Sequence, residues 1–168
     1  TSLLFTGFMA QSYEIEDLAD GLHRFIDDRH RSVFLITPQG AIVTDPLNKK
    51  AATWLKEQIK TRYNVPVKYV VYSHNHSDHI YGAEVFKSPN TTFVAHKFTA
   101  QDIKNTKMKT VMPNLTFDDE LILTLGGSTL KLNYHGPNDG RGSVSMLFEK
   151  QKTLFVVDWI VIGRMPWQ

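Results

Sequence analysis

The chain contains the sequence Ser73-His74-Asn75-His76-Ser77-Asp78-His79 directly after the apolar run Val67–Tyr72. Three of the seven histidines in the chain lie in this short stretch. Lys68 is the only charged residue of the preceding run, which is typical of a strand that is covered on both faces inside a sheet flanked by helices. The histidine-rich stretch is therefore predicted to begin where a buried strand ends.

The spacing of these polar residues suits metal ligands. His74 and His76 are two residues apart, so on extended chain they point the same way and can bind one cation at about 2.0–2.1 Å. Asp78 and His79 are adjacent and diverge, and can serve a second cation roughly 3.5–4 Å from the first. The alternative is a polar loop that happens to be rich in histidine. Ligands of open sheets bind beyond the carboxyl ends of strands, which favours the metal site.

The pattern His-x-His-x-Asp-His after a hydrophobic strand resembles the metal motif of the metallo-β-lactamase fold superfamily of metallohydrolases. The similarity extends from about Leu22 to the end of the chain. It implies an α/β (α+β) fold: a four-layer αββα sandwich with the metals at one edge of the two sheets. At 168 residues the chain fits one such domain, expected over residues 13–168.

Two further aspartates match family positions. Asp45 ends a hydrophobic strand, and the resemblance implies that it hydrogen-bonds to the metal loop or to a ligating histidine. The alternative is an ordinary strand-end aspartate before Pro46. Asp158 matches the aspartate that bridges two metals in the family, a role that its two oxygens allow. Its alternative is a polar strand terminus.

The chain departs from the family pattern near Gly136-Pro137. The family shows Gly-Pro-x-His here, and Asp139 stands where that histidine belongs. Asp139 is the first candidate for the missing ligand, because an aspartate oxygen binds zinc at about 2.0–2.2 Å. Its charge would offset more of the metal charge, so a bound water would be acidified less. His135 is the second candidate, and a site that uses neither residue is the third.

Composition restricts the partners. The net charge of +2 is too small to indicate nucleic acid or an acidic membrane surface, and no apolar stretch approaches the roughly 20 residues that cross a bilayer. The chain has no cysteine, so the ligands must be His, Asp or Glu. Such ligands suit one or two zinc ions and, less specifically, iron or manganese. The expected partner is a small-molecule substrate.

The two ends of the chain carry separate expectations. Residues 1–12 resemble the end of an export signal, with small residues at Ala10 and Ser12, or else form an N-terminal strand. The first reading favours a periplasmic or secreted protein, and the second leaves a cytoplasmic one. The family's last metal-binding histidine follows further helices and strands, so the domain is expected to be incomplete after the Asp158 motif. Exposed sheet edges then predict homo-oligomers.

The remaining elements follow from turn and periodicity signals. Lys104–Lys109 is a polar, basic connection, read as a solvated loop or as a border of the substrate cleft. Hairpins are predicted around Asp20-Gly21, Pro38–Gly40, Gly126–Ser128 and Glu149–Lys152, helices over Lys49–Tyr63, His79–Phe86 and Phe98–Lys104, and a further strand over Thr92–His96.

The resemblance implies a zinc-dependent hydrolase in which metal-activated water attacks a small amide or ester, as in a β-lactamase. Asp78 is the candidate catalytic residue, because it can orient the attacking water or shuttle a proton. Fold alone does not select the substrate. The alternative function is a truncated domain that binds metal, catalyses poorly or not at all, and self-associates.

Overall fold

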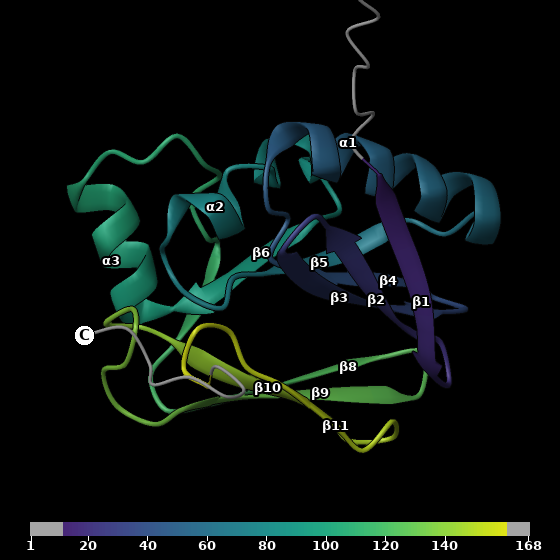
Figure 1. Ribbon diagram of the computed structural model, residues 1–168. Helices are drawn as coiled ribbons and strands as arrows, with labels where there is room; N and C mark the ends of the chain where they lie inside the picture. The colour runs from purple at the N-terminus through teal and green to yellow at the C-terminus, as the bar shows by residue number, and fades with distance from the viewer. Residues whose placement is uncertain (1–11, 161–168) are drawn as a thin grey trace, which may run out of the picture.

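A computed structural model describes residues 12–160, which form two β-sheets packed face to face with helices over the outer face of the larger sheet (Figure 1). The larger sheet has the order β1-β2-β3-β4-β5-β6-β7, and the smaller one the order β11-β10-β9-β8. The larger sheet is antiparallel from β1 to β4 and parallel from β4 to β7. Its strands are β1 (Tyr13–Ala19), β2 (Leu22–Asp27), β3 (His30–Thr37), β4 (Gly40–Thr44), β5 (Val67–Val71), β6 (Thr92–His96) and β7 (Leu115–Phe117).

The smaller sheet is antiparallel throughout. It consists of β8 (Glu120–Leu125), β9 (Ser128–Tyr134), β10 (Val144–Phe148) and β11 (Thr153–Phe155). Within residues 12–160 no helix covers its outer face, where Ile122 and Leu154 are 54% and 59% exposed. The described residues therefore supply three of the four layers of the expected αββα sandwich, and the predicted mixed α/β fold is confirmed. Self-association through this sheet stays a prediction.

The alternation of side chains along the strands builds two separate cores. Phe34, Val43 and Val70 face the helices, where they pack with Leu55 and other apolar residues of α1 (Lys49–Gln58). Their neighbours along the chain point to the other side and pack against the smaller sheet. This second core contains Leu35, Ile42, Val71, Val94, Leu130, Val144 and Met146. Both faces of β5 are therefore covered, as the apolar run before the metal loop predicts.

The helix α1 begins where the sequence predicts. The side chain of Asn48 accepts hydrogen bonds from the backbone amides of Lys50 and Ala51, and so caps the first turn. The last part of the predicted helix is instead the wider turn η1 (Ile59–Tyr63). It ends at Asn64, whose φ of 52° lies in the left-handed region.

The helix predicted over His79–Phe86 is wrong, because the segment forms two short turns. These are α2 (Ser77–Ile80) and the 3₁₀ turn η2 (Ala83–Phe86). Gly82 lies between them, and a Cβ there would stand 2.3 Å from the carbonyl oxygen of Pro46. The amide of Gly82 donates a hydrogen bond to the carbonyl oxygen of Leu47 and not to the preceding helical turn, so contact with the loop after β4 interrupts the helix. The third helix, α3 (Lys97–Asn105), matches the prediction within one residue at each end.

Residues 1–11, which carry most of the predicted signal or strand, and residues 161–168 lie outside the described residues. Between residues 12 and 160, no helix is both long enough and apolar enough to cross a membrane.

Candidate metal centre

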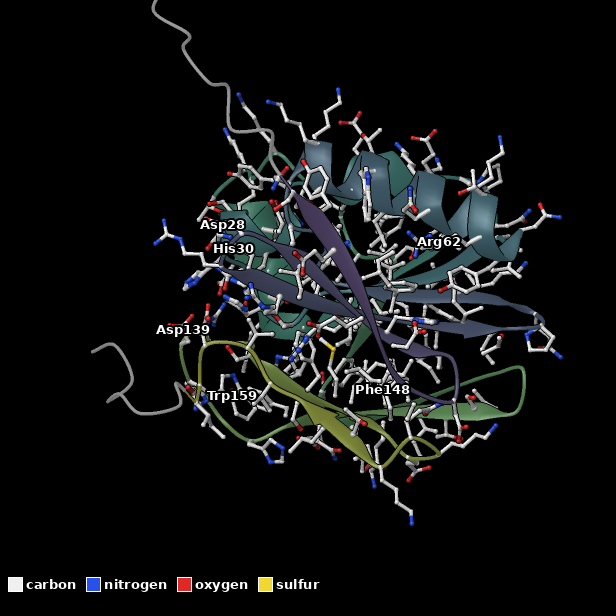
Figure 2. All side chains as sticks on the ribbon, turned by 45° about the vertical axis from the view of Figure 1, so that its right-hand side comes forward. Asp28, His30, Arg62, Asp139, Phe148 and Trp159 are labelled. Atoms are coloured by element: carbon white, nitrogen blue, oxygen red, sulfur yellow. The ribbon has the colours of Figure 1, made fainter. Side chains whose placement is uncertain are left out.

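The predicted ligands come together at one edge of the molecule, between the two sheets. Asp45 follows β4, the metal loop follows β5, Asp139 lies between β9 and β10, and Asp158 follows β11. Backbone hydrogen bonds hold these segments in register: the amide of Asp45 donates to Val71, and the amide of Val144 donates to Ser73. Figure 2 shows Asp139 at this edge. The site thus lies beyond the carboxyl ends of parallel strands, as expected.

Four side chains form the tightest group. Ligand atoms of His74, His76, Asp139 and Asp158 all lie within 4.8 Å of one another. Asp139 Oδ2 is 3.0 Å from His76 Nδ1 and 3.5 Å from His74 Nε2, and Asp158 Oδ2 is 3.8 Å from His74 Nε2. Ligands about 2.0–2.2 Å from a tetrahedral zinc stand roughly 3.3–3.6 Å apart. The group therefore has the size of a zinc site.

Unpaired atoms in this group support the same reading. His74 Nε2 and Asp139 Oδ2 are buried and have no hydrogen-bond partner within residues 12–160. Burial of a polar atom without a partner is unfavourable, and a cation between the two atoms would remove that cost. Two imidazoles and two carboxylates are also the donor types that zinc accepts. The residues therefore fit a bound divalent cation.

A chain of hydrogen bonds orients His74. Asp45 is buried, and its carboxylate accepts hydrogen bonds from the amide (2.7 Å) and the hydroxyl (2.6 Å) of Ser73. The hydroxyl oxygen is then free to accept a hydrogen bond from His74 Nδ1 at 2.8 Å. This leaves the lone pair of Nε2 directed at the group, and burial lowers the pKa of His74, so the ring is neutral as a ligand must be.

The loop that carries Asp139 packs directly on His74. A Cβ added at Gly140 would stand 2.9 Å from His74 Cβ, so only glycine allows this approach. The hydroxyl of Ser143 accepts a hydrogen bond from the amide of Gly140, and Arg141 pairs with Asp102 on α3. These contacts fix the place of Asp139 beside the two histidines.

His135, the second candidate for the missing ligand, does not join the group. Its Nε2 is 2.9 Å from the hydroxyl of Ser145, and its ring packs edge-on against Trp159. Both contacts hold the ring in the second sheet. Of the two candidates, Asp139 is the one that faces His74 and His76.

The second half of the motif lies beside the first group. His79 Nε2 is 3.2 Å from Asp158 Oδ2 and 3.6 Å from Asp78 Oδ2, while its Nδ1 is 3.5 Å from Asp45. Burial lowers the pKa of His79, but the carboxylates of Asp158 and Asp45 outweigh it and raise the pKa to about 10. A cation that binds His79 Nε2 must therefore displace a proton.

Asp78 projects from the start of α2, with 55% of its side chain exposed. Burial raises its pKa, but His79 and His30 together hold the pKa below its ordinary value. Asp78 is therefore a carboxylate at neutral pH. Its exposed carboxylate, beside His79, is able to accept a proton.

His30 is a site residue that sequence reasoning missed. It begins β3, 48 residues before Asp78, and its Nε2 is 3.2 Å from Asp78 Oδ2. Its ring stands edge-on to His79, with centroids 5.9 Å apart. No local motif marks this histidine. It is recognised only in the folded structure, where the turn between β2 and β3 lies next to the metal loop.

Comparison with known proteins identifies the class. The chain belongs to the metallo-beta-lactamase superfamily, whose family model matches residues 26–166. The predicted resemblance is therefore confirmed.

Solved structures share this fold. A metallo-beta-lactamase from Pontibacter korlensis is 22% identical, with a TM-score of 0.77 over 86% of this chain and 71% of that one. The metallo-beta-lactamase IND-7 is 22% identical, with a TM-score of 0.74 over 87% of this chain and 71% of that one. The sec-alkyl sulfatase PisA1 is 16% identical with a TM-score of 0.74, and the match covers 87% of this chain but 31% of that one. At these identities the likeness concerns the fold alone.

A curated relative is closer in sequence over a shorter stretch. The 2,4-dinitroanisole O-demethylase subunit alpha of Nocardioides sp. (strain JS1661) is 30% identical over 101 residues. The match covers 58% of this chain and 30% of that protein, so the chain spans less than a third of its relative's length.

Proposed function

We propose that this chain is the metal-binding domain of a zinc-dependent hydrolase that acts on a small amide or ester. The observation that carries the proposal is the group of His74, His76, Asp139 and Asp158, in which His74 Nε2 and Asp139 Oδ2 are buried without a hydrogen-bond partner among the described residues. Membership of the metallo-beta-lactamase superfamily supports the reaction class.

Each residue of the centre has a separate role in this proposal. A bound divalent cation would supply polarisation of the scissile carbonyl and would lower the pKa of a bound water, but less than with three histidine ligands, because the charge of Asp139 offsets part of the metal charge. His74, His76 and Asp139 would hold that cation, with Asp158 at its side. Asp78, which is ionised and exposed, accepts a proton from the attacking water and passes it to solvent. No separate nucleophilic side chain is required.

Metal content and hydrolysis test the proposal together. We expect purified, zinc-loaded protein to bind at least one zinc per chain by elemental analysis and to hydrolyse a chromogenic cephalosporin or 4-nitrophenyl acetate. Treatment with a chelator should remove both the zinc and the activity, and added zinc should restore them. The name of the curated relative makes 2,4-dinitroanisole a third substrate to assay.

Two outcomes of this test count against hydrolysis. Tight zinc binding without turnover of any of the three substrates would favour the alternative function, a metal-binding domain without catalysis. Failure to bind zinc would contradict both functions. Iron and manganese are loaded in parallel, because the same His and Asp donors accept them.

A cleft beside Asp78 bears on the class of substrate. It has a volume of about 670 Å³, and Tyr81, Lys107 and Lys109 line it together with His76 and Asp78. Two lysines lie next to the metal loop, so the basic connection after α3 borders the cleft. Their positive charges favour a substrate that carries an anionic group near the scissile bond.

We therefore expect Lys107→Gln and Lys109→Gln each to raise the KM for an anionic ester about fivefold, which corresponds to roughly 1 kcal/mol for a solvent-exposed charge pair. The KM for a neutral ester of similar length should stay unchanged. Mono-4-nitrophenyl succinate and 4-nitrophenyl butyrate form such a pair. Lys104→Gln is the matched control, since Lys104 is exposed on α3 and does not line the cleft. Equal changes for both esters would contradict a charge effect.

A further inference from the structure

We propose that His30 is a ligand of a second cation, in a site that it completes with Asp78, His79 and Asp158. The inference rests on metal binding by this chain, which the proposed function shares, but it does not depend on hydrolysis. The motif itself offers Asp78 and His79, and Asp158 lies beside them. His30 adds an imidazole from a different part of the fold.

The strand β3 directs His30 toward the metal loop. Side chains two apart on a strand point to the same face, so His30 shares its face with Ser32. The hydroxyl of Ser32 hydrogen-bonds to the carbonyl of Thr44, the residue before Asp45. The face of β3 that carries His30 and Ser32 is therefore the face next to the end of β4, where Asp45 begins the site. Figure 2 shows His30 and Asp139 on the same side of the molecule.

The turn before β3 holds the backbone of His30 in place. His30 pairs with Asp27 at the end of β2. The guanidinium of Arg31 donates hydrogen bonds to the carbonyl oxygens of Asp28 (2.6 Å) and His30 (3.1 Å). The imidazole therefore projects from an anchored hairpin end, which limits the entropy that it would lose on binding a cation.

Three distances between neighbouring members of this group are as short as those between ligands of one metal ion. From His30 Nε2 to Asp78 Oδ2 is 3.2 Å, from Asp78 Oδ2 to His79 Nε2 is 3.6 Å, and from His79 Nε2 to Asp158 Oδ2 is 3.2 Å. Each is close to the roughly 3.3–3.6 Å that separates two ligands of one tetrahedral zinc. Two imidazoles and two carboxylates also repeat the donor set of the first group.

A simpler role for His30 is a hydrogen bond that positions Asp78. The two roles differ in what can replace the imidazole. A glutamine amide can donate a hydrogen bond to a carboxylate, but it is a poor ligand for zinc, which takes Cys, His and carboxylate donors. His30→Gln therefore retains the positioning role and removes the ligand role.

Calorimetric titration of the metal-free full chain with zinc chloride separates these roles. We expect two binding events in the original protein. His30→Ala and His30→Gln should both weaken the second event at least tenfold and leave the first within about twofold. Cobalt(II) titration gives a second readout, because loss of a nitrogen ligand alters the visible absorption of the second equivalent. His135→Ala is the matched control, since His135 is also a histidine but bonds to Ser145 and does not join either group.

Each other result has a defined meaning. If His30→Ala weakens the second event and His30→Gln restores it, His30 only positions Asp78 and the proposal is wrong. If His30→Ala leaves both events unchanged, or if the original chain binds a single zinc, the proposal is also wrong. Two zinc ions bound without hydrolysis would contradict the proposed function while leaving the role of His30 intact. Circular dichroism of each variant shows that it is folded before titration.

Discussion

Replacement of Asp158 by asparagine is expected to lower kcat/KM for ester or β-lactam hydrolysis about a thousandfold, because cation polarisation contributes several kcal/mol and about 1.4 kcal/mol corresponds to a factor of ten. Asp158 Oδ2 lies 3.2 Å from His79 Nε2 and 3.8 Å from His74 Nε2, so one carboxylate serves both halves of the centre. A hydrogen bond from His79 holds the pKa of Asp158 below its ordinary value, and the side chain is ionised. The side-chain amide of asparagine carries no negative charge and so binds a cation more weakly.

Asparagine is chosen because it keeps the size of the side chain and tolerates the left-handed backbone at this position, where φ is 62°. Asp20→Asn is the matched control. Asp20 is exposed and has a φ of 42°. It lies in the turn between β1 and β2, next to the C-terminal end of β3, whereas His30 lies at the N-terminal end of that strand. Steady-state kinetics and zinc content are measured on both variants. Activity within tenfold of the original in Asp158→Asn, at full zinc content, would contradict a role for Asp158 at the metal.

Sequence and structure agree where the signal is local. The apolar run before the metal loop predicts a strand covered on both faces, and Val70 and Val71 point into the two different cores. The spacing of His74 and His76 predicts one shared cation, and the two side chains meet at Asp139. Turn chemistry likewise predicts the hairpin joining β8 and β9, with left-handed Gly126 and Gly127 at its tip.

Prediction fails where contacts between distant segments decide the outcome. The helix expected over His79–Phe86 is interrupted because the amide of Gly82 bonds to the carbonyl of Leu47, a contact that periodicity does not encode. The strand β7 has only three residues, too few to show an alternating pattern. His30 belongs to the same category, since its partner Asp78 is 48 residues away. The choice between Asp139 and His135 likewise depends on how the loop after β9 folds back onto His74.

The second large effect is expected from Asp45→Ala, which should lower the free energy of unfolding by about 3 kcal/mol, the order of loss when the charged partner of buried hydrogen bonds is removed. The amide of Ser73 would lose its acceptor in a buried site, and the hydroxyl of Ser73 would no longer be held toward His74. For a chain of this size the loss corresponds to a fall in Tm of roughly 6–12 °C. Thermal unfolding of the metal-free protein measures it.

Asp45→Asn separates the structural part of this effect from the part that acts on the metal. The amide oxygen still accepts a hydrogen bond from the Ser73 amide, so stability should fall less than in Asp45→Ala. The NH₂ group donates to the Ser73 hydroxyl and cannot accept its proton, so that proton is free to be donated to His74 Nδ1, which favours the tautomer that carries its proton on Nε2. Zinc affinity should therefore fall about 10–100-fold in both variants. Asp28→Ala controls for the backbone, because Asp28 is exposed with φ at 54° and Asp45 has φ at 32°. Unchanged zinc affinity in Asp45→Asn would show that the orientation of His74 does not depend on this hydrogen-bond chain.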